Sequence, residues 1–214
     1  MQIYWHGYTS VRIEAKTGER ECTLLTDPFE NETSIRFPRT LTPDVVVLSH
    51  QDRKRFNLEP IQGTPFVISD PGEYEVKGLF VNGVQDPKAE EGLLRPVVYR
   101  FQAEGMTLAF LGGLKRALTE AELEALPNID ILLLPVGGGE GMDAKTAAHA
   151  ISAIEPRIVV PLSYDIPGIK ATLGSVDAFC KHLGACERLN ANRLKIAKKD
   201  LPVDQIMVAV LERA

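Results

Sequence analysis

The sequence predicts an α/β fold with two β-sheets and helices on the outside. The first half of the 214-residue chain consists mainly of short β-type runs separated by glycine-containing turns. The second half alternates helical patterns with continuous apolar strands, which is typical of βαβ units. No low-complexity linker divides the halves, so we expect residues 1–214 to form a single domain.

The strands of the first half are marked by β-branched and aromatic residues. Gly7 and Gly18 separate three short runs, as in a meander. The uninterrupted apolar run at 44–48 is typical of a strand buried on both faces. The Ala-Glu-Gly sequence at 103–105 is a hairpin signal. The expected strands are 3–5, 9–14, 23–26, 44–48, 64–69, 75–84, 96–102 and 106–111, with a turn at 70–73, bends at Gly78 and Gly83, and a loop at 85–96.

Helix signals appear in the second half of the chain. Thr119 and Glu122 have the spacing of a capping box, which predicts a helix over 120–126. The apolar residues of 143–154 share one helical face, and Gly184 is expected to end a third helix over 173–183. The strands expected between and after these helices are 129–135, 157–162 and 205–211.

The overall charge limits the classes of partner. The formal net charge is -5 and the pI is about 5.5, so we expect no nucleic-acid partner and no anionic membrane surface as a partner. No apolar run approaches the roughly 20 residues that span a bilayer. The first residues lack the basic and apolar regions of a signal peptide, which favours a cytoplasmic location.

The three cysteines are odd in number and show no Cys-x-x-Cys spacing. We therefore expect reduced thiols, as in a cytoplasmic protein. A disulfide between Cys180 and Cys186 is the less favoured alternative.

The most informative segment follows the buried strand at 44–48. A strand that ends in Ser-His often opens a metal-binding loop of the form His-x-His-x-Asp-His. Here only His50 stands at a ligand position, and Asp52, Lys54 and Arg55 occupy the other three. An ammonium or guanidinium group cannot coordinate Zn²⁺ and brings a positive charge to the place of the metal.

Six motifs along the chain resemble the metallo-β-lactamase superfamily. The resemblance is strongest to its compact bacterial and archaeal branch related to ascorbate-6-phosphate lactonases. It implies a four-layer αβ/βα sandwich with the functional site at one rim, where strand-end loops of both halves meet. The motifs are LLTDPF at 24–29, PDVVVLSH at 43–50, PGEYEVKG at 71–78, FLGGL at 110–114, IDILLLPVGG at 129–138 and PRIVVPLSY at 156–164.

The resemblance implies a site for two metal ions in active relatives, and most of that site is altered here. Asp27 matches an aspartate that orients the histidine loop, and we expect it to have a structural role. His50 is the one position that keeps the family's ligand type. The altered positions are Asp52, Lys54, Arg55, Gln85, Gly113 and Ser163, with Asp86 beside Gln85.

These residues support a non-catalytic binding or regulatory module, with no catalytic residue and no metal cofactor. A small anionic ligand is the expected partner, and the candidate ligand-binding residues are His50, Asp52, Lys54, Arg55, Gln85, Asp86 and Ser163. The alternative is a hydrolase of lactonase or phosphoester type that uses a reduced Zn²⁺ site, formed by His50 and Asp52 with Gln85 or Asp86. A third alternative is a structural subunit of a larger assembly.

The cations near this loop have two interpretations. They could neutralise the acidic groups that converge on the rim, namely Asp27, Asp52 and Asp86. They could equally be solvated loop charges. The cations considered are Arg53, Lys54, Arg55, Arg95, Lys115 and Arg116, and the glycine-rich segment 137–141 is interpreted as a tight turn.

Overall fold

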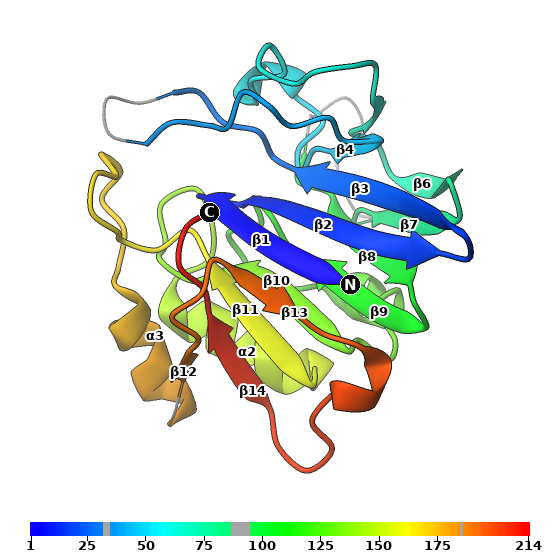
Figure 1. Ribbon diagram of the computed structural model, residues 1–214. Coiled ribbons are helices and arrows are strands. Elements are labelled where there is room, and N and C mark those ends of the chain that lie inside the picture. The colour runs from blue at the N-terminus through cyan, green and yellow to red at the C-terminus, as the bar shows by residue number, and fades with distance from the viewer. Residues whose placement is uncertain (32–34, 87–94, 185) are drawn as a thin grey trace.

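The computed structural model describes residues 1–31, 35–86, 95–184 and 186–214. In this part of the chain two β-sheets pack face to face (Figure 1). The six-stranded sheet has the order β13 (Arg193–Lys195), β1 (Gln2–Gly7), β2 (Ser10–Thr17), β3 (Arg20–Thr26), β4 (Val45–Val47) and β5 (Phe66–Ile68). The eight-stranded sheet has the order β12 (Glu187–Arg188), β14 (Met207–Val210), β11 (Ile158–Leu162), β10 (Ile131–Pro135), β9 (Met106–Phe110), β8 (Val98–Ala103), β7 (Leu79–Val84) and β6 (Gly72–Val76).

The helices connect strands of the eight-stranded sheet. Strands β9, β10, β11 and β14 are parallel neighbours, and parallel neighbours require crossover connections. All five residues of β10 and of β11 are buried, as expected for strands covered on both faces. The helices are α1 (Glu120–Glu124), α2 (Ala144–Ile154) and α3 (Val176–Leu183), and none in the described ranges is long and apolar enough to cross a membrane.

The outer face of the six-stranded sheet has a different cover. Leu25 and Val46 of this sheet, with Leu48 directly after β4, pack against Phe37 and Leu41, which lie in the segment between β3 and β4. In the described residues this outer layer consists of loops and the 3₁₀ turn η1 (Arg53–Arg55), drawn in blue and cyan in Figure 1. Prolines at 28, 38, 43, 60 and 65 disfavour a helix in these loops. The α/β sandwich is confirmed, with loops as the outer layer of its first half.

Most predicted elements are confirmed, and the differences are local. The expected single strand at 75–84 is the hairpin β6–β7, which turns at Lys77 and Gly78, where both residues have positive φ. The third helix begins later than predicted, because Ser175 caps it and accepts a hydrogen bond from the Ala178 N–H. Strands β12 and β13 and the 3₁₀ turn η2 (Lys198–Asp200) were not predicted, and most of the expected loop at 85–96 lies outside the described residues.

The prediction of reduced thiols is wrong for two of the three cysteines. Cys180 in α3 and Cys186 before β12 form a disulfide, and Cys22 is a buried free thiol. The chain reverses direction at Gly184, which has a φ of 89°. This reversal brings the Cα atoms of the two cysteines to 5.6 Å, well within the range that a disulfide bridges.

The disulfide can be tested by counting thiols. Protein unfolded without a reductant should react with one equivalent of a thiol reagent per chain, at Cys22, and reduced protein should react with three. The Cys180→Ser variant should lose roughly 2 kcal/mol of unfolding free energy, because the closed loop is short. Three reactive thiols in protein that was never reduced would contradict the disulfide.

Candidate functional site

The ends of parallel strands from both sheets converge at one rim of the sandwich. Asp27 follows β3, His50 follows β4, Gly113 follows β9 and Ser163 follows β11. The loop after β10 contributes Glu140. Together with residues after β1, they surround a pocket of about 180 Å³. The lining residues are Tyr8, Thr9, Asp27, Phe29, Ser49, His50, Arg55, Phe56, Gly113, Glu140, Gly141 and Ser163.

Three lining residues hold a backbone conformation that side chains rarely adopt. The φ angles of Tyr8, Asp27 and Ser163 are 47°, 38° and 50°. Each such residue costs on the order of 1–3 kcal/mol and persists only where surrounding contacts enforce it. The Ser163 N–H donates to the Tyr8 carbonyl at 2.9 Å, and the Asp27 N–H donates to the Val47 carbonyl at 3.0 Å. Such residues cluster at functional sites, which supports a role for this pocket.

Asp27 organises the floor of the pocket through Ser49. Its Oδ1 accepts from the Ser49 N–H at 2.7 Å, and its Oδ2 accepts from the Ser49 hydroxyl at 2.6 Å. The Ser49 Oγ in turn accepts from the Gly113 N–H of the other sheet at 2.9 Å. Gly112 permits this approach, since a Cβ there would lie 2.1 Å from the Ser49 Cβ. The predicted structural role of Asp27 therefore has a direct geometric basis.

Burial dominates the electrostatics of Asp27. Loss of hydration raises its pKa to about 6, although the Ser49 hydrogen bonds and the positive charge of Arg55 act in the opposite direction. The residue is only 2% exposed. Its charged form is thus destabilised in the folded protein near neutral pH.

His50 lines the pocket as a hydrogen-bond donor. Its Nδ1 accepts from the Asp52 N–H at 3.0 Å, so the ring proton of the neutral imidazole is on Nε2. Burial and the charge of Arg55 lower the pKa of His50, which favours this neutral form. A protonated Nε2 cannot coordinate a metal ion.

Arg55 lies in the pocket, but its partner was not predicted. Its Nη2 is 2.7 Å from Oε2 of Glu140, and the Lys115 Nζ is 2.9 Å from Oε1 of the same carboxylate. The expectation that Arg55 and Lys115 neutralise Asp27, Asp52 or Asp86 is therefore wrong about the main partner. Glu140 was missed because its glycine-rich segment matched a simple turn, and nothing local in the sequence connects it with Arg55.

Asp52 and Lys54 of the same loop do not line the pocket. The Asp52 side chain caps η1 and accepts from the Lys54 N–H at 3.2 Å. Lys54 is exposed. Their neighbour Arg53 donates from Nε to the Ser69 hydroxyl at 2.9 Å, away from the lining residues.

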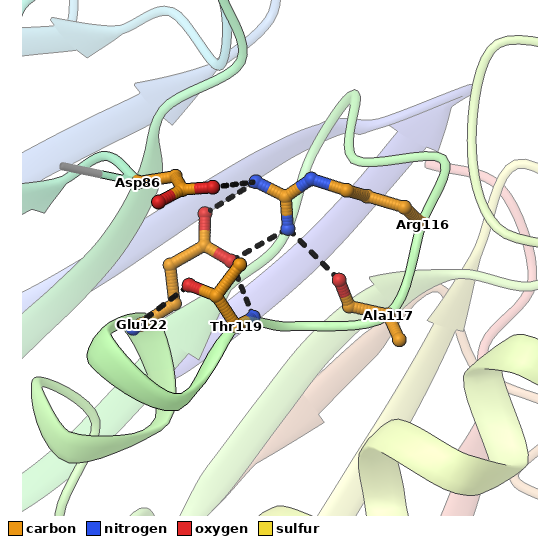
Figure 2. A network of polar contacts seen from close by, with 5 residues as sticks. All are labelled: Asp86, Arg116, Ala117, Thr119 and Glu122. Carbon is orange, nitrogen blue, oxygen red and sulfur yellow. Dashed lines mark hydrogen bonds and ion pairs between the residues drawn. The ribbon is translucent and has the colours of Figure 1, made fainter. Parts of the chain in front are cut away.

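Gln85 and Asp86 likewise lie beside the rim, outside the lining of the pocket. The Gln85 side-chain amide donates to Oε1 of Gln51 at 3.1 Å. Asp86 is 4.0 Å from Nη2 of Arg116, in agreement with the predicted charge compensation (Figure 2). Of the predicted binding residues, the structure thus gathers His50, Arg55 and Ser163 around the pocket, with the structural residue Asp27.

The network around Arg116 supports the loop that follows β9. Arg116 makes a bidentate contact with Glu122, with Nη1–Oε2 at 2.7 Å and Nη2–Oε1 at 2.9 Å (Figure 2). Glu122 is 1% exposed and completes the capping box with Thr119 at the start of α1. The predicted capping box is therefore confirmed, and its carboxylate also holds the rim loop.

Comparison with known proteins identifies the family of this chain. The β-lactamase superfamily domain matches residues 2–163. A UPF0173 metal-dependent hydrolase of Thermoplasma acidophilum is 25% identical over 199 residues, which cover 77% of this chain and 84% of that protein. A UPF0173 metal-dependent hydrolase of Salinibacter ruber is 26% identical over 212 residues, which cover 84% and 92%.

Solved structures agree with these sequence matches. A crystal structure from Thermotoga maritima, described as a candidate Zn-dependent hydrolase of the metallo-β-lactamase superfamily, has a TM-score of 0.80 and 30% identity, and 99% of each chain is covered. A metallo hydrolase from Ignicoccus hospitalis, at 17% identity and a TM-score of 0.63, covers 86% of this chain and 90% of its own and shows the shared fold. The predicted superfamily is confirmed, and the link to ascorbate-6-phosphate lactonases stays a prediction.

The metal ions that these relatives imply do not fit the residues present here. Arg55 brings a guanidinium group into the pocket, and His50 already uses Nδ1 as an acceptor. Both oxygens of Asp27 accept from Ser49. Over the ranges that the structure describes, no group of three or more His, Cys, Asp or Glu side chains is arranged to hold a metal ion. We therefore derive no chemical step through a metal at this site.

The contact between Arg116 and Glu122 predicts a measurable loss of stability. Arg116→Ala should lower the unfolding free energy by about 2 kcal/mol, because the buried Glu122 carboxylate loses two charged hydrogen bonds. Lys115→Ala is the matched control. Its partner Glu140 is exposed, so this variant should lose less than about 1 kcal/mol of unfolding free energy. Equal losses in urea unfolding of the two variants would contradict this role.

The buried Asp27 predicts an inverted pH dependence. Its pKa rises from 3.8 to about 6 on folding, so the folded state binds this proton more tightly than the unfolded chain. Stability should therefore fall as pH increases from about 4 to 6, by about 3 kcal/mol from this group. Asp27→Asn should remove the fall, measured by urea unfolding from pH 4 to 7.

A control of opposite sign is available at Asp143. Hydrogen bonds from Thr146 at the start of α2 lower the pKa of Asp143, so its contribution is present at neutral pH and is lost as the pH falls. Asp143→Asn should thus remove a slope of the other sign. If the unfolding free energies of wild type and Asp27→Asn change in parallel between pH 4 and 7, burial does not destabilise the charged form of Asp27.

Proposed function

We propose that this protein, which belongs to the β-lactamase superfamily, is a non-catalytic binding or regulatory module. The loop after β4, where active relatives carry metal ligands, brings the guanidinium group of Arg55 into the pocket. In this proposal the rim pocket binds a small anionic ligand where relatives bind metal. The observation that carries it is the position of Arg55 in the pocket, beside the neutral donor His50. A cation and neutral donors attract an anion and repel a metal ion.

The other lining groups support a small ligand. The pocket volume of about 180 Å³ suits an anion with few heavy atoms. Ser163 adds a hydroxyl donor, and Phe29 and Phe56 form an apolar wall. The Asp27 carboxylate opposes an anion, but both its oxygens are already bound to Ser49 donors, which reduces the repulsion.

A metal-dependent hydrolase of lactonase or phosphoester type is the second candidate, and the descriptions of the relatives favour it. Its proposed ligands are His50, Asp52 and Asp86. Two of these carry other contacts, since Asp52 caps η1 and Asp86 lies beside Arg116. The first proposal therefore has more support from the geometry.

The remaining parts of the proposal concern the setting. We propose no nucleic-acid or membrane partner, in line with the net charge of -5, and a cytoplasmic location. Disulfides are rare in cytoplasmic proteins, so the disulfide between Cys180 and Cys186 opposes this location, and a disulfide that persists in freshly lysed cells would count against it.

Metal analysis separates the two candidate functions. Protein purified without added metal should contain far less than one Zn, Mn or Fe per chain. EDTA should leave its melting temperature unchanged, because there is no bound metal to remove. A metal present at about 1,000 times its Kd would stabilise the fold by roughly 4 kcal/mol, so its removal would be easily detected. Near-stoichiometric metal, or a drop of several degrees with EDTA, would favour the hydrolase.

A further inference from the structure

One carboxylate, that of Glu140, is held between two cations at the pocket. Arg55 approaches one oxygen at 2.7 Å and Lys115 approaches the other at 2.9 Å. Glu140 and Arg55 both line the pocket. The hydrogen bonds from Lys115 and Arg55 lower the pKa of Glu140, so this group is an anion near neutral pH. The protein thus places an anion of its own on the cations of the proposed binding site.

The contacts of Glu140 are of a kind that a ligand can replace. Its side chain is 74% exposed, and the side chains of Arg55 and Lys115 are 41% and 52% exposed. Ion pairs at such exposed positions are weak. Glycines flank Glu140 on both sides, and Gly138 and Gly139 have φ angles of 80° and 66° that favour glycine. The Glu140 carboxylate can therefore move away from Arg55 and Lys115 without disrupting buried packing.

We infer that Glu140 is a built-in competitor for the site, and that the ligand it competes with carries a phosphoryl group. This inference rests on the proposed anion-binding function and specifies its ligand and its control. When a phosphate or small phosphate monoester enters, its oxygens take over Arg55 and Lys115, and the Glu140 side chain turns to solvent. Glu140 sets the affinity, and Arg55 is the binding residue.

The number of donors favours a phosphoryl group over a carboxylate. Glu140 already offers one carboxylate to the two cations, and a second carboxylate would gain little over it. A phosphoryl group carries close to two negative charges and three acceptor oxygens at neutral pH. It can accept from Arg55 and Lys115 and still has acceptor capacity for His50 and Ser163, which line the same pocket.

The test measures inorganic phosphate binding by calorimetry to the full chain and its variants. Glu140→Gln keeps the shape of the side chain and removes its charge, so it should bind phosphate about 3- to 10-fold more tightly than wild type. Arg55→Ala should weaken binding at least 10-fold. Glu59→Gln is the matched control, because Glu59 is an exposed carboxylate outside the pocket lining, in the segment between β4 and β5 that carries Arg55, and this variant should bind phosphate like wild type.

Each outcome is decisive once melting curves show that the variants are folded. If wild type binds phosphate and Glu140→Gln binds it no more tightly, the competitor role is wrong and the proposed anion-binding function stands. Acetate bound as tightly as phosphate would overturn the phosphoryl assignment alone. If neither wild type nor Glu140→Gln binds phosphate or acetate, the inference and the proposed anion-binding function are both wrong.

Discussion

The hydrogen bonds between the Asp27 carboxylate and Ser49 hold the rim of the pocket together. Asp27 follows β3 and Ser49 follows β4, and the Ser49 hydroxyl connects them to Gly113 after β9. This short chain of donors and acceptors joins the two sheets where their strands end. The strained conformations of Asp27 and Ser163 are tolerated because the surrounding contacts fix them. The geometry of the pocket depends on this junction more than on any residue that points into the pocket.

The acidic groups around the rim are paired with cations or with hydrogen-bond donors. Arg55 and Lys115 hold Glu140, and Arg116 lies beside Asp86 while it holds Glu122. In the described part of the chain no cation forms a salt bridge with Asp27, whose carboxylate accepts hydrogen bonds from Ser49. Of these cations Arg55 lines the pocket, and Lys115 and Arg116 lie outside its lining.

Sequence reasoning was most successful where local residue patterns determine the outcome. The continuous apolar runs of β10 and β11 predicted buried strands, and the capping box at Thr119 predicted the start of α1. The motif positions also located Asp27, His50 and Arg55 at the same rim. It failed where distant segments meet, because the partner of Arg55 lies 85 residues away in a loop with no signal of its own.

Two further errors have local physical causes. The disulfide depends on the chain reversal at Gly184, which sets the distance between Cys180 and Cys186. Composition alone suggested free thiols. Lys77-Gly78 turns β6 back on β7, but it is a less distinctive turn sequence than Asn-Gly or Asp-Gly, and it was taken for a bend.

The loop cover over the first sheet makes the two sides of the pocket mechanically unequal. Phe56, next to Arg55, packs with Leu58 and Ile61 against the apolar cluster of that cover, so the backbone beside the cation is anchored in a core. Glu140 has glycines on both sides and an exposed side chain. A ligand that enters the pocket would therefore contact one side whose backbone is anchored in a core, beside Arg55, and one exposed side chain, that of Glu140. Binding would therefore displace the exposed Glu140 side chain and leave the backbone beside Arg55 in place.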